Sequence, residues 1–574
     1  MSDPVLLLGD RFQAALVLAF GPEHAGVDPA IRPSNHADFQ ANLALGLAKT
    51  LKKSPRDVAA AILAKLDGTG VVERTELAGP GFINIWLRAE FLSAEVARVA
   101  AAGTAGVEAH PTPERIVIDY SSPNVAKEMH VGHLRSSVIG DALARVLEAL
   151  GHTVLRQNHL GDWGTPFGML IEHLLDEGAD ADAHSIRDLN AFYQAARAKF
   201  DASPEFAARA RVRVVSLQSG DEATLGFWRK LVEASRTHFN ALYRLLGVTL
   251  KDEDIAGESL FNPMLGEVVS ELESMGQCVE NEGAKCVFVP GYVGRDDKPL
   301  PLIARKQDGG YGYAATDLAA IRYRLQTLNA TRILYVVGAP QTQHLAMIRD
   351  AAIQAGWLAL PARAEHVAFG SVLGEDGKVL RTRAGATVRL IELLEEGVER
   401  ARSIVAEKAP ELPIEQRDAI ARAVGIGAIK YADLSSDRVK DYVFDWSRML
   451  AFDGNTAPYL QYAHARICSI LRKSNESVEL ASIAISEPQE RVLALSLLAF
   501  PRALADVAES LSPHRLCGYL YDLATAFSAF YEHCPGLKAA TPEVRRSRLL
   551  LSATTATVIA RGLELLGIEA PEKM

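Results

Sequence analysis

Two histidines three residues apart, His130 and His133, flank Gly132 in the stretch SSPNVAKEMHVGHLRS, and Lys127 stands three residues before the first of them. Histidines at this spacing can share one helix face and bind a metal, but no third ligand follows at a recognisable distance. They can also be ordinary structural residues. The third hypothesis is phosphate chemistry, because imidazole N–H groups and a lysine can stabilise phosphate oxygens as charge shifts in a transition state.

The place of this stretch in the chain favours phosphate. It lies between a short apolar segment at 116–120 and an amphipathic segment at 132–150, which together predict a strand followed by a helix. The amino end of a helix offers N–H groups and a partial positive charge to an anion. Gly132 would let a planar nucleotide approach the backbone without meeting a Cβ atom.

A strand–helix–strand pattern occurs at 116–160 and again at 332–373. Such units predict an α/β fold, a doubly wound parallel nucleotide-binding sheet whose ligands lie at the carboxyl ends of its strands. Residues from about 175 to 300 are poorly patterned. We expect them to form an insertion with helices and a small antiparallel piece at 284–291.

Two further units flank the predicted sheet. Residues 38–66 have helical spacing, with Ser54 and Pro55 as N-cap and first helical residue, and 79–87 alternates like a strand, so we expect an N-terminal α+β domain. Beyond about residue 388 the apolar spacing is helical, which predicts a C-terminal all-α helical bundle domain. The predicted boundaries are 1–110 for the N-terminal domain, 100–114 for a linker, 111–440 for the Rossmann-type domain with its insertion, and 441–574 for the bundle.

The composition excludes several classes of protein. Hydrophobic residues make up 48% and charged residues 23%, a balance typical of globular domains. No apolar run reaches the roughly 18 residues that span a bilayer, and the start has no basic leader region, so we expect a cytoplasmic protein with no membrane contact. Five cysteines without a C-x-x-C pair indicate neither a disulfide framework nor a zinc site. The net charge of −10 requires that any nucleic acid be held by local basic patches.

The quoted residues carry a resemblance to a known family. HVGH resembles the H-I-G-H signature of class I aminoacyl-tRNA synthetases, and the longer run 121–141 resembles the arginyl-tRNA synthetase family. Further similar stretches lie at 161–174, 311–324, 423–438 and 449–466, so the resemblance covers nearly the full chain. It implies an arginine–tRNA ligase that uses ATP and Mg²⁺ to activate L-arginine and then charges tRNA(Arg), with tRNA bound during activation.

The resemblance also implies the site. Arginine recognition needs a carboxylate for forked hydrogen bonds, and Asp317 lies four residues after Tyr313, on the same face of a predicted helix. The implied arginine-binding residues are Asp119, Asn124, His133, Tyr313, Asp317 and Gln341. The implied ATP-binding residues are Lys127, His130, Val131, Gly132, His133 and Arg383, and the implied catalytic residues are Lys127, His130, His133 and Lys378, with no metal ligand.

One family signature is missing. Class I enzymes hold the ATP phosphates with a second loop, K-M-S-K-S, and the position of its last lysine is Thr382 here. Lys127 has the charge and position to substitute, with Lys378 as a helper and Arg381 and Arg383 adding positive charge. Two further departures are Pro166 and Gly338, where the family carries Gln and Asp.

The resemblance implies tRNA contacts at both ends of the chain, the outer corner of tRNA on the N-terminal domain and the anticodon on the last 120 or so residues. Candidate basic patches are the run from Arg209, the helix with Arg466, Arg472 and Lys473, and residues 545–548, although each could be an ordinary solvated helix face. We expect a monomer. Two alternatives remain open at this point: a class I synthetase for another amino acid, and a non-catalytic tRNA-binding paralogue.

Overall fold

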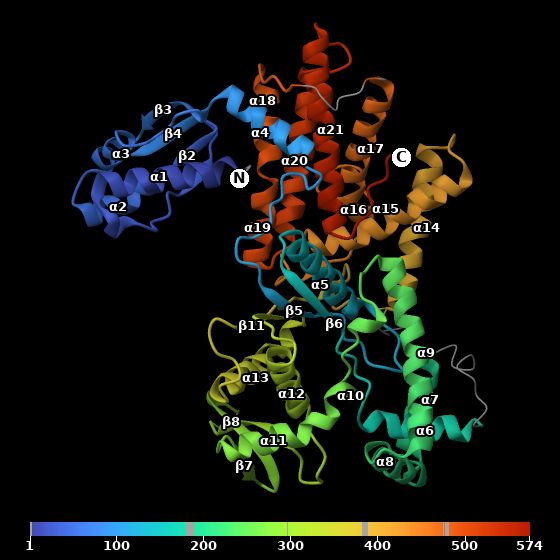
Figure 1. Cartoon of the computed structure of the whole chain (residues 1–574). Helices are drawn as coiled ribbons and strands as arrows, with labels where there is room; N and C mark the ends of the chain where they lie inside the picture. Colours follow the sequence, from blue (N-terminus) through green and yellow to red (C-terminus); the bar gives the residue numbers. More distant parts are fainter. Residues whose placement is uncertain (1–2, 179–188, 295–296, 382–387, 475, 477–481) are drawn as a thin grey trace.

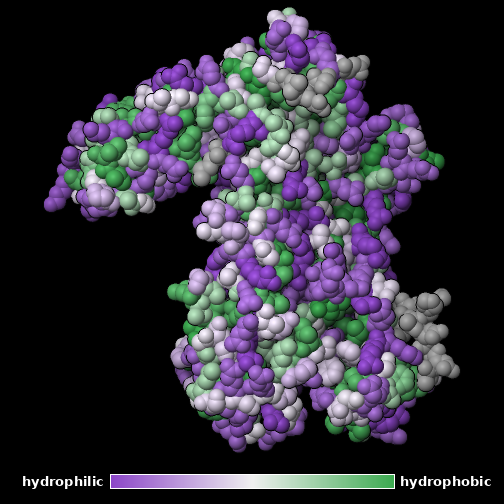
Figure 2. Space-filling model, in the orientation of Figure 1, coloured by the Kyte–Doolittle hydropathy of each residue, from purple (hydrophilic) through white to green (hydrophobic). Residues whose placement is uncertain are grey.

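The computed structural model describes residues 3–178, 189–294, 297–381, 388–474, 476 and 482–574. Figure 1 shows three parts: a blue N-terminal domain that projects to one side, an orange and red helical bundle beside it, and a cyan to yellow central region below the bundle. No helix in these ranges is long and apolar enough to cross a membrane. Hydrophilic residues dominate the face seen in Figure 2, with smaller apolar patches between them.

A four-stranded parallel sheet in the order β11-β10-β5-β6 forms the centre of the cyan to yellow region, as predicted. β5 and β10 are almost entirely buried, as expected of parallel strands covered on both faces. The register aligns Asp119 with Gln157 and Tyr335, so these residues end their strands at one edge. The elements are β5 (Arg115–Asp119), α5 (Val131–Ala149), β6 (Thr153–Gln157), α12 (Tyr313–Gln326), β10 (Arg332–Tyr335), η4 (Ala339–Gln341), α13 (Thr342–Gln354), β11 (Arg363–His366) and β12 (Val372–Leu373).

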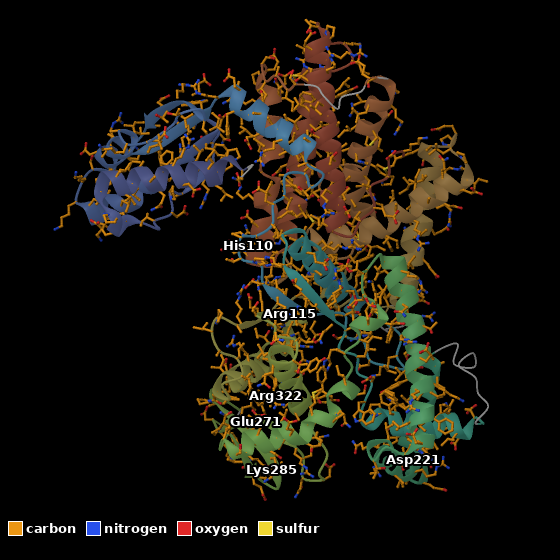
Figure 3. The ribbon with its side chains drawn as sticks, viewed as in Figure 1. His110, Arg115, Asp221, Glu271, Lys285 and Arg322 are labelled. Atoms are coloured by element: carbon orange, nitrogen blue, oxygen red, sulfur yellow. The ribbon has the colours of Figure 1, made fainter. Side chains whose placement is uncertain are left out.

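The insertion contains helices and an antiparallel sheet, which confirms the prediction, and the sheet has three strands in the order β7-β8-β9. Glu271 of α11 and Arg322 of α12, both labelled in Figure 3, form a 2.9 Å ion pair. This pair joins the insertion to α12. The elements are α6 (Thr165–Asp176), α7 (Leu189–Ala202), α8 (Pro204–Gln218), α9 (Glu222–Leu246), η2 (Asp252–Asp254), α10 (Glu258–Phe261), η3 (Asn262–Met264), α11 (Leu265–Ser274), β7 (Cys278–Asn281), β8 (Ala284–Val293) and β9 (Pro299–Arg305).

The N-terminal domain is an antiparallel sheet in the order β1-β2-β4-β3, packed against helices. Ser54 caps α3 by accepting from the Asp57 N–H (3.1 Å), and Pro55 is its first residue, as predicted. α1 and α4 were not predicted, and α4 occupies the first two residues of the expected linker. The elements are α1 (Pro4–Phe20), η1 (Pro22–His24), β1 (Ile31–Pro33), β2 (Phe39–Ala41), α2 (Leu43–Leu51), α3 (Pro55–Leu63), β3 (Val72–Ala78), β4 (Phe82–Leu87) and α4 (Ala89–Ala101).

The C-terminal part is helical, as predicted, and it holds the N-terminal domain through a buried ion pair. Arg491 of α18 donates to both carboxylate oxygens of Asp38 (2.7 and 2.5 Å) and to the Leu87 carbonyl. α4 also packs against α18 and α21. The elements are α14 (Leu390–Lys408), α15 (Ile414–Leu434), β13 (Tyr442–Val443), α16 (Trp446–Met449), α17 (Ala457–Ser474), α18 (Pro488–Leu498), α19 (Phe500–Ser510), α20 (His514–His533) and α21 (Pro542–Leu565).

Candidate active site

The two histidines of HVGH cap the helix that they begin. His130 is the N-cap of α5, and its Nδ1 accepts a hydrogen bond from the Gly132 N–H (3.0 Å). Nδ1 of His133 accepts from the His130 N–H (3.2 Å), and the two ring centroids lie 4.1 Å apart. Because Nδ1 accepts in both rings, the neutral imidazoles carry their protons on Nε2. Each histidine therefore keeps one N–H with which to donate.

Both histidines are held in the neutral form. Burial and the nearby Lys127 lower the pKa of His130 below its usual value. Burial, with smaller contributions from His130 and Lys127, lowers the pKa of His133 to about 3. At neutral pH the rings are therefore uncharged donors, which suits hydrogen bonding to phosphate without repelling a cationic amino acid.

We expected unpaired backbone N–H groups at the start of α5, but the first of these groups already have acceptors within the chain. The Val131 N–H donates to the Val388 carbonyl (3.1 Å), the His133 N–H donates to the His130 carbonyl (2.8 Å), and the Gly132 N–H serves the His130 ring. The free donors at this position are the two Nε2–H groups. Within the described ranges no three His, Cys, Asp or Glu side chains are grouped to hold an ion.

Asn124 and Lys127 are exposed on the loop that joins β5 to α5. The loop pairs with the segment after β6, since the Val125 N–H donates to the Gly161 carbonyl and the Gly161 N–H donates to the Pro123 carbonyl (3.1 Å each). Nζ of Lys127 lies 4.5 Å from the ring centroid of Tyr193 on α7. The loop thus presents a lysine beside the two histidines.

Tyr313 and Asp317 lie one turn apart on α12, as the spacing predicts. Tyr313 is 77% exposed, whereas Asp317 is half-buried and accepts from Nε2 of His344 on α13 at 2.6 Å, which raises the pKa of that histidine. Gln341 is exposed and precedes α13 directly. The structure therefore brings α12 and the start of α13 together around Asp317.

The carboxylate of Asp119 is already hydrogen-bonded within the chain. Its Oδ2 accepts from the fully buried Arg324 (2.7 Å), and its Oδ1 accepts from the Ser122 hydroxyl (3.0 Å). Both oxygens have partners within the chain, so Asp119 has less capacity for a direct bond to a substrate than Asp317 has.

Sequence reasoning missed Glu258 and His344. Glu258 begins α10, and burial together with the negative charges of Asp162 and Asp317 raises its pKa to about 7. A carboxyl group held at this pKa beside other carboxylates gains from a bound cation. Its sequence neighbourhood in the insertion carries no motif, so only the three-dimensional grouping could reveal it.

The loop that corresponds in position to the missing K-M-S-K-S signature follows β12. Lys378 is exposed in its turn, where the Gly374 N–H donates to the Lys378 carbonyl (2.8 Å). Thr382 and Arg383 lie outside the described residues. The chain returns to α5 at Leu390, whose N–H donates to the Met129 carbonyl (3.0 Å), so the far end of the loop is anchored beside the histidines.

Two of the three predicted basic patches, the run from Arg209 and residues 545–548, contain arginines that pair with carboxylates within the chain. Arg209 and Arg213 pair with Glu172, and Arg545, Arg546 and Arg548 pair with Glu476, Glu543 and Glu490. On α17, Arg466 lies over the Tyr531 ring and Arg472 donates to the Glu572 carbonyl, while Lys473 is exposed. Part of the positive charge of these two patches is therefore balanced within the chain, and all three patches remain candidate surfaces.

Comparison with known proteins decides the family. The family described as tRNA synthetases class I (R), catalytic domain, matches residues 95–446, the Arginyl tRNA synthetase N terminal domain matches 7–87, and the DALR anticodon binding domain matches 460–574. The chain is 58% identical over 578 residues to the arginine–tRNA ligase of Thermobifida fusca, covering 100% of both chains. It is 52% identical to that of Frankia casuarinae, covering 96% of each.

The chain belongs to the arginyl-tRNA synthetase family. Its structure is similar to the arginyl-tRNA synthetase of Plasmodium falciparum, with a TM-score of 0.85, 31% identity and 99% of each chain covered. The enzyme is therefore a ligase, an arginine-specific aminoacyl-tRNA synthetase that uses ATP. Full-length identity to arginine–tRNA ligases decides against both alternatives, another amino acid and a non-catalytic paralogue.

The structure makes Gly132 a test of the capping geometry. A Cβ at this position would lie 2.8 Å from Cε1 and 2.9 Å from Nδ1 of His130, so Gly132→Ala must displace that ring. We expect the rate of arginyl-tRNA formation to fall by about a hundredfold, because small displacements of catalytic groups have effects of that size. Gly518→Ala is the matched control, since its Cβ meets nothing within 4 Å on α20. Equal rates for the two variants would contradict the geometry.

Proposed function

We propose that the chain makes arginyl-tRNA in two steps at the carboxyl edge of its parallel sheet. A carboxylate oxygen of L-arginine attacks the α-phosphorus of ATP in line, and pyrophosphate leaves. A hydroxyl of the terminal adenosine of tRNA(Arg) then attacks the arginyl carbonyl, and AMP leaves. The observation that carries this proposal is the pair of neutral Nε2–H donors at the start of α5, beside Lys127. Catalysis then consists of positioning and electrostatic stabilisation.

His130 and His133 donate to phosphate oxygens, and Lys127 balances the charge that grows there. Lys378 approaches the phosphates from the loop after β12, and Arg383 adds positive charge to ATP binding. Val131 and Gly132 lie under the nucleotide and contribute the positive end of the α5 dipole. Mg²⁺ arrives with ATP as the substrate complex and offsets phosphate charge.

Asp317 binds the arginine guanidinium, and Glu258 joins it as a second carboxylate. A guanidinium would relieve the crowding of negative charge that raises the pKa of Glu258. Tyr313 and Gln341 line the pocket. Asn124 holds the amino acid's backbone groups, with His133 beside them, and Asp119 acts at the pocket's inner end, with Arg324 as its partner.

The tRNA bridges the three predicted domains, 1–110, 111–440 and 441–574. In the N-terminal domain, a hollow of about 530 Å³ is lined by His36, Gln40, Glu76, Ala78, Phe82, Asn84 and Trp86. Aromatic rings with side-chain amides on an open sheet face suit an unstacked RNA base. The exposed surface of α17 supplies a second contact for the anticodon arm. The enzyme acts in the cytoplasm as a monomer.

Lys127→Ala tests the replacement of the missing loop lysine. We expect the kcat of arginyl-adenylate formation, measured by pyrophosphate exchange with tRNA present, to fall by about a hundredfold. Folding should be unaffected, because Lys127 is exposed. Lys65→Ala, at an exposed position in the N-terminal domain, is the control. A rate near that of the parent enzyme would show that another group stabilises the phosphates.

Asp317→Asn tests arginine recognition. The amide keeps the shape of the side chain but loses the charge, so the KM for arginine should rise by about ten- to a hundredfold while the KM for ATP changes little. Asp350→Asn on α13, whose partners are Tyr292 and Arg349, is a matched control. An unchanged arginine KM in Asp317→Asn would remove this residue from the pocket.

Phe82→Leu tests the N-terminal tRNA contact. Loss of the ring face should raise the KM for tRNA by about tenfold, the size expected for one stacked base, with little change in kcat. Phe288→Leu, another half-buried phenylalanine on a strand, is the control. Equal tRNA KM values in the two variants would argue against base stacking at this hollow.

A further inference from the structure

The loop between β5 and α5 has an unfavourable backbone conformation. Ser121, Ser122 and Ala126 adopt φ values of 72°, 47° and 62°, in the left-handed region that side chains other than glycine rarely occupy. Such conformations persist only where the surroundings hold them, and they cluster at functional sites. Asn124 and Lys127 both stand on this loop, so whatever holds it also sets their positions.

Tyr243, a buried residue of α9, holds the first half of the loop. Its hydroxyl lies 2.8 Å from Oγ of Ser121 and accepts from Nδ2 of Asn158 (3.0 Å). Oδ1 of Asn158 in turn accepts from the Ser122 N–H (3.0 Å). Tyr243 is 3% exposed, so water cannot readily replace these bonds.

Ser235, two turns earlier on α9, holds the second half. Its Oγ accepts from the Ala126 N–H (2.9 Å) and donates to the Leu231 carbonyl (2.9 Å), and the side chain is fully buried. The bond to Ala126 lies directly before Lys127. The two anchors therefore fix the loop on either side of Asn124, and both come from a helix of the insertion that touches no substrate in the proposed mechanism.

We propose that Tyr243 and Ser235 are positioning residues for arginine activation, holding the strained loop so that Asn124 meets the amino acid and Lys127 meets the phosphates. This inference rests on the roles proposed above for those two residues. Tyr243 holds Ser121 and Ser122, which come shortly before Asn124 in the chain. This anchor therefore affects arginine binding most. The Ser235 anchor adjoins Lys127 and therefore governs the ATP step most.

The test compares Tyr243→Phe and Ser235→Ala, which remove one oxygen each and keep the packed carbon atoms. In pyrophosphate exchange with tRNA present, we expect kcat to fall about tenfold or more in both variants. The KM for arginine should rise mainly in Tyr243→Phe and the KM for ATP mainly in Ser235→Ala. The dissociation constant for tRNA should stay the same.

Two matched variants separate positioning from simple loss of stability. Tyr519→Phe removes a hydroxyl that donates to the Ser496 carbonyl. Ser552→Ala removes a buried helical hydroxyl that donates to the Arg548 carbonyl, as the Ser235 hydroxyl donates to the Leu231 carbonyl. These controls should lower Tm by similar amounts but leave kcat and both KM values unchanged. If Tyr243→Phe does not fold, Ser235→Ala decides the question alone, through kcat and the ATP KM.

Asn124→Ala and Lys127→Ala, measured alongside, distinguish a failure of the anchoring role from a failure of the roles assigned to Asn124 and Lys127. If they impair activation while Tyr243→Phe and Ser235→Ala match their controls, the anchoring role is overturned and the proposed mechanism stands. If Asn124→Ala and Lys127→Ala themselves behave like the parent enzyme, the assigned roles fail and the positioning inference fails with them. Loss of kcat with the expected KM split in the anchor variants supports the inference.

Discussion

The hydrogen bond from the Gly132 N–H to Nδ1 of His130 is the contact on which the rest of the site depends. Helix starts need acceptors for their first N–H groups, and Ser, Thr, Asp or Asn usually supply them. Here histidine rings do so through Nδ1, with the consequence that the proton of each neutral ring lies on Nε2. The anion-binding capacity of a helix terminus is thereby transferred from the backbone to side chains that can reach further.

The helix that begins at this contact is also the connection between the domains. α5 is buried along nearly its whole length and carries charged groups that pair with distant segments. Arg135 pairs with Asp433 of α15 at 3.2 Å and donates to the Lys440 carbonyl, and Asp141 accepts from Thr249 and Arg145. Leaving any of these buried charges unpaired would be costly, so the helical part of the chain cannot shift far without disturbing α5. The helical part of the chain and the two histidines of HVGH thus depend on the same element, α5.

The predictable parts of this molecule are those where local pattern and tertiary structure agree. The strand at 116–120, the helix after it and the second strand–helix–strand unit all follow from apolar spacing, and Ser54 is an N-cap as its sequence context predicts. α4 also has helical apolar spacing, with Leu92, Val96 and Val99 on one buried face. It was not predicted, and the small residues that follow it indicate a linker.

The arrangement of the candidate site residues follows from the sequence where a motif is contiguous, and not where side chains converge from separate elements. Glu258 meets Asp317 and Asp162 only after the insertion folds back on the sheet. Likewise, the bond between the Tyr243 and Ser121 hydroxyls spans 122 residues of chain. Neither arrangement leaves a trace in the spacing of neighbouring residues. The occupied backbone N–H groups of Val131 and Gly132 were also unpredictable, because their partners depend on the return of the chain at Val388 and on a ring rotamer.

The site must accept a cationic amino acid and a polyanionic nucleotide within a few ångströms of each other, and its charges are arranged accordingly. Carboxylates gather around Asp317 and Glu258, where burial and mutual repulsion raise the pKa of Glu258 and favour a positive ligand. On the side proposed for the phosphates, Lys127 contributes a positive charge, whereas burial lowers the pKa of both histidines. Charged imidazoles would bind ATP more strongly before reaction, but they would also repel the ammonium group of arginine. Neutral donors aimed at the phosphate instead gain most as negative charge shifts during transfer, which is when stabilisation raises the rate.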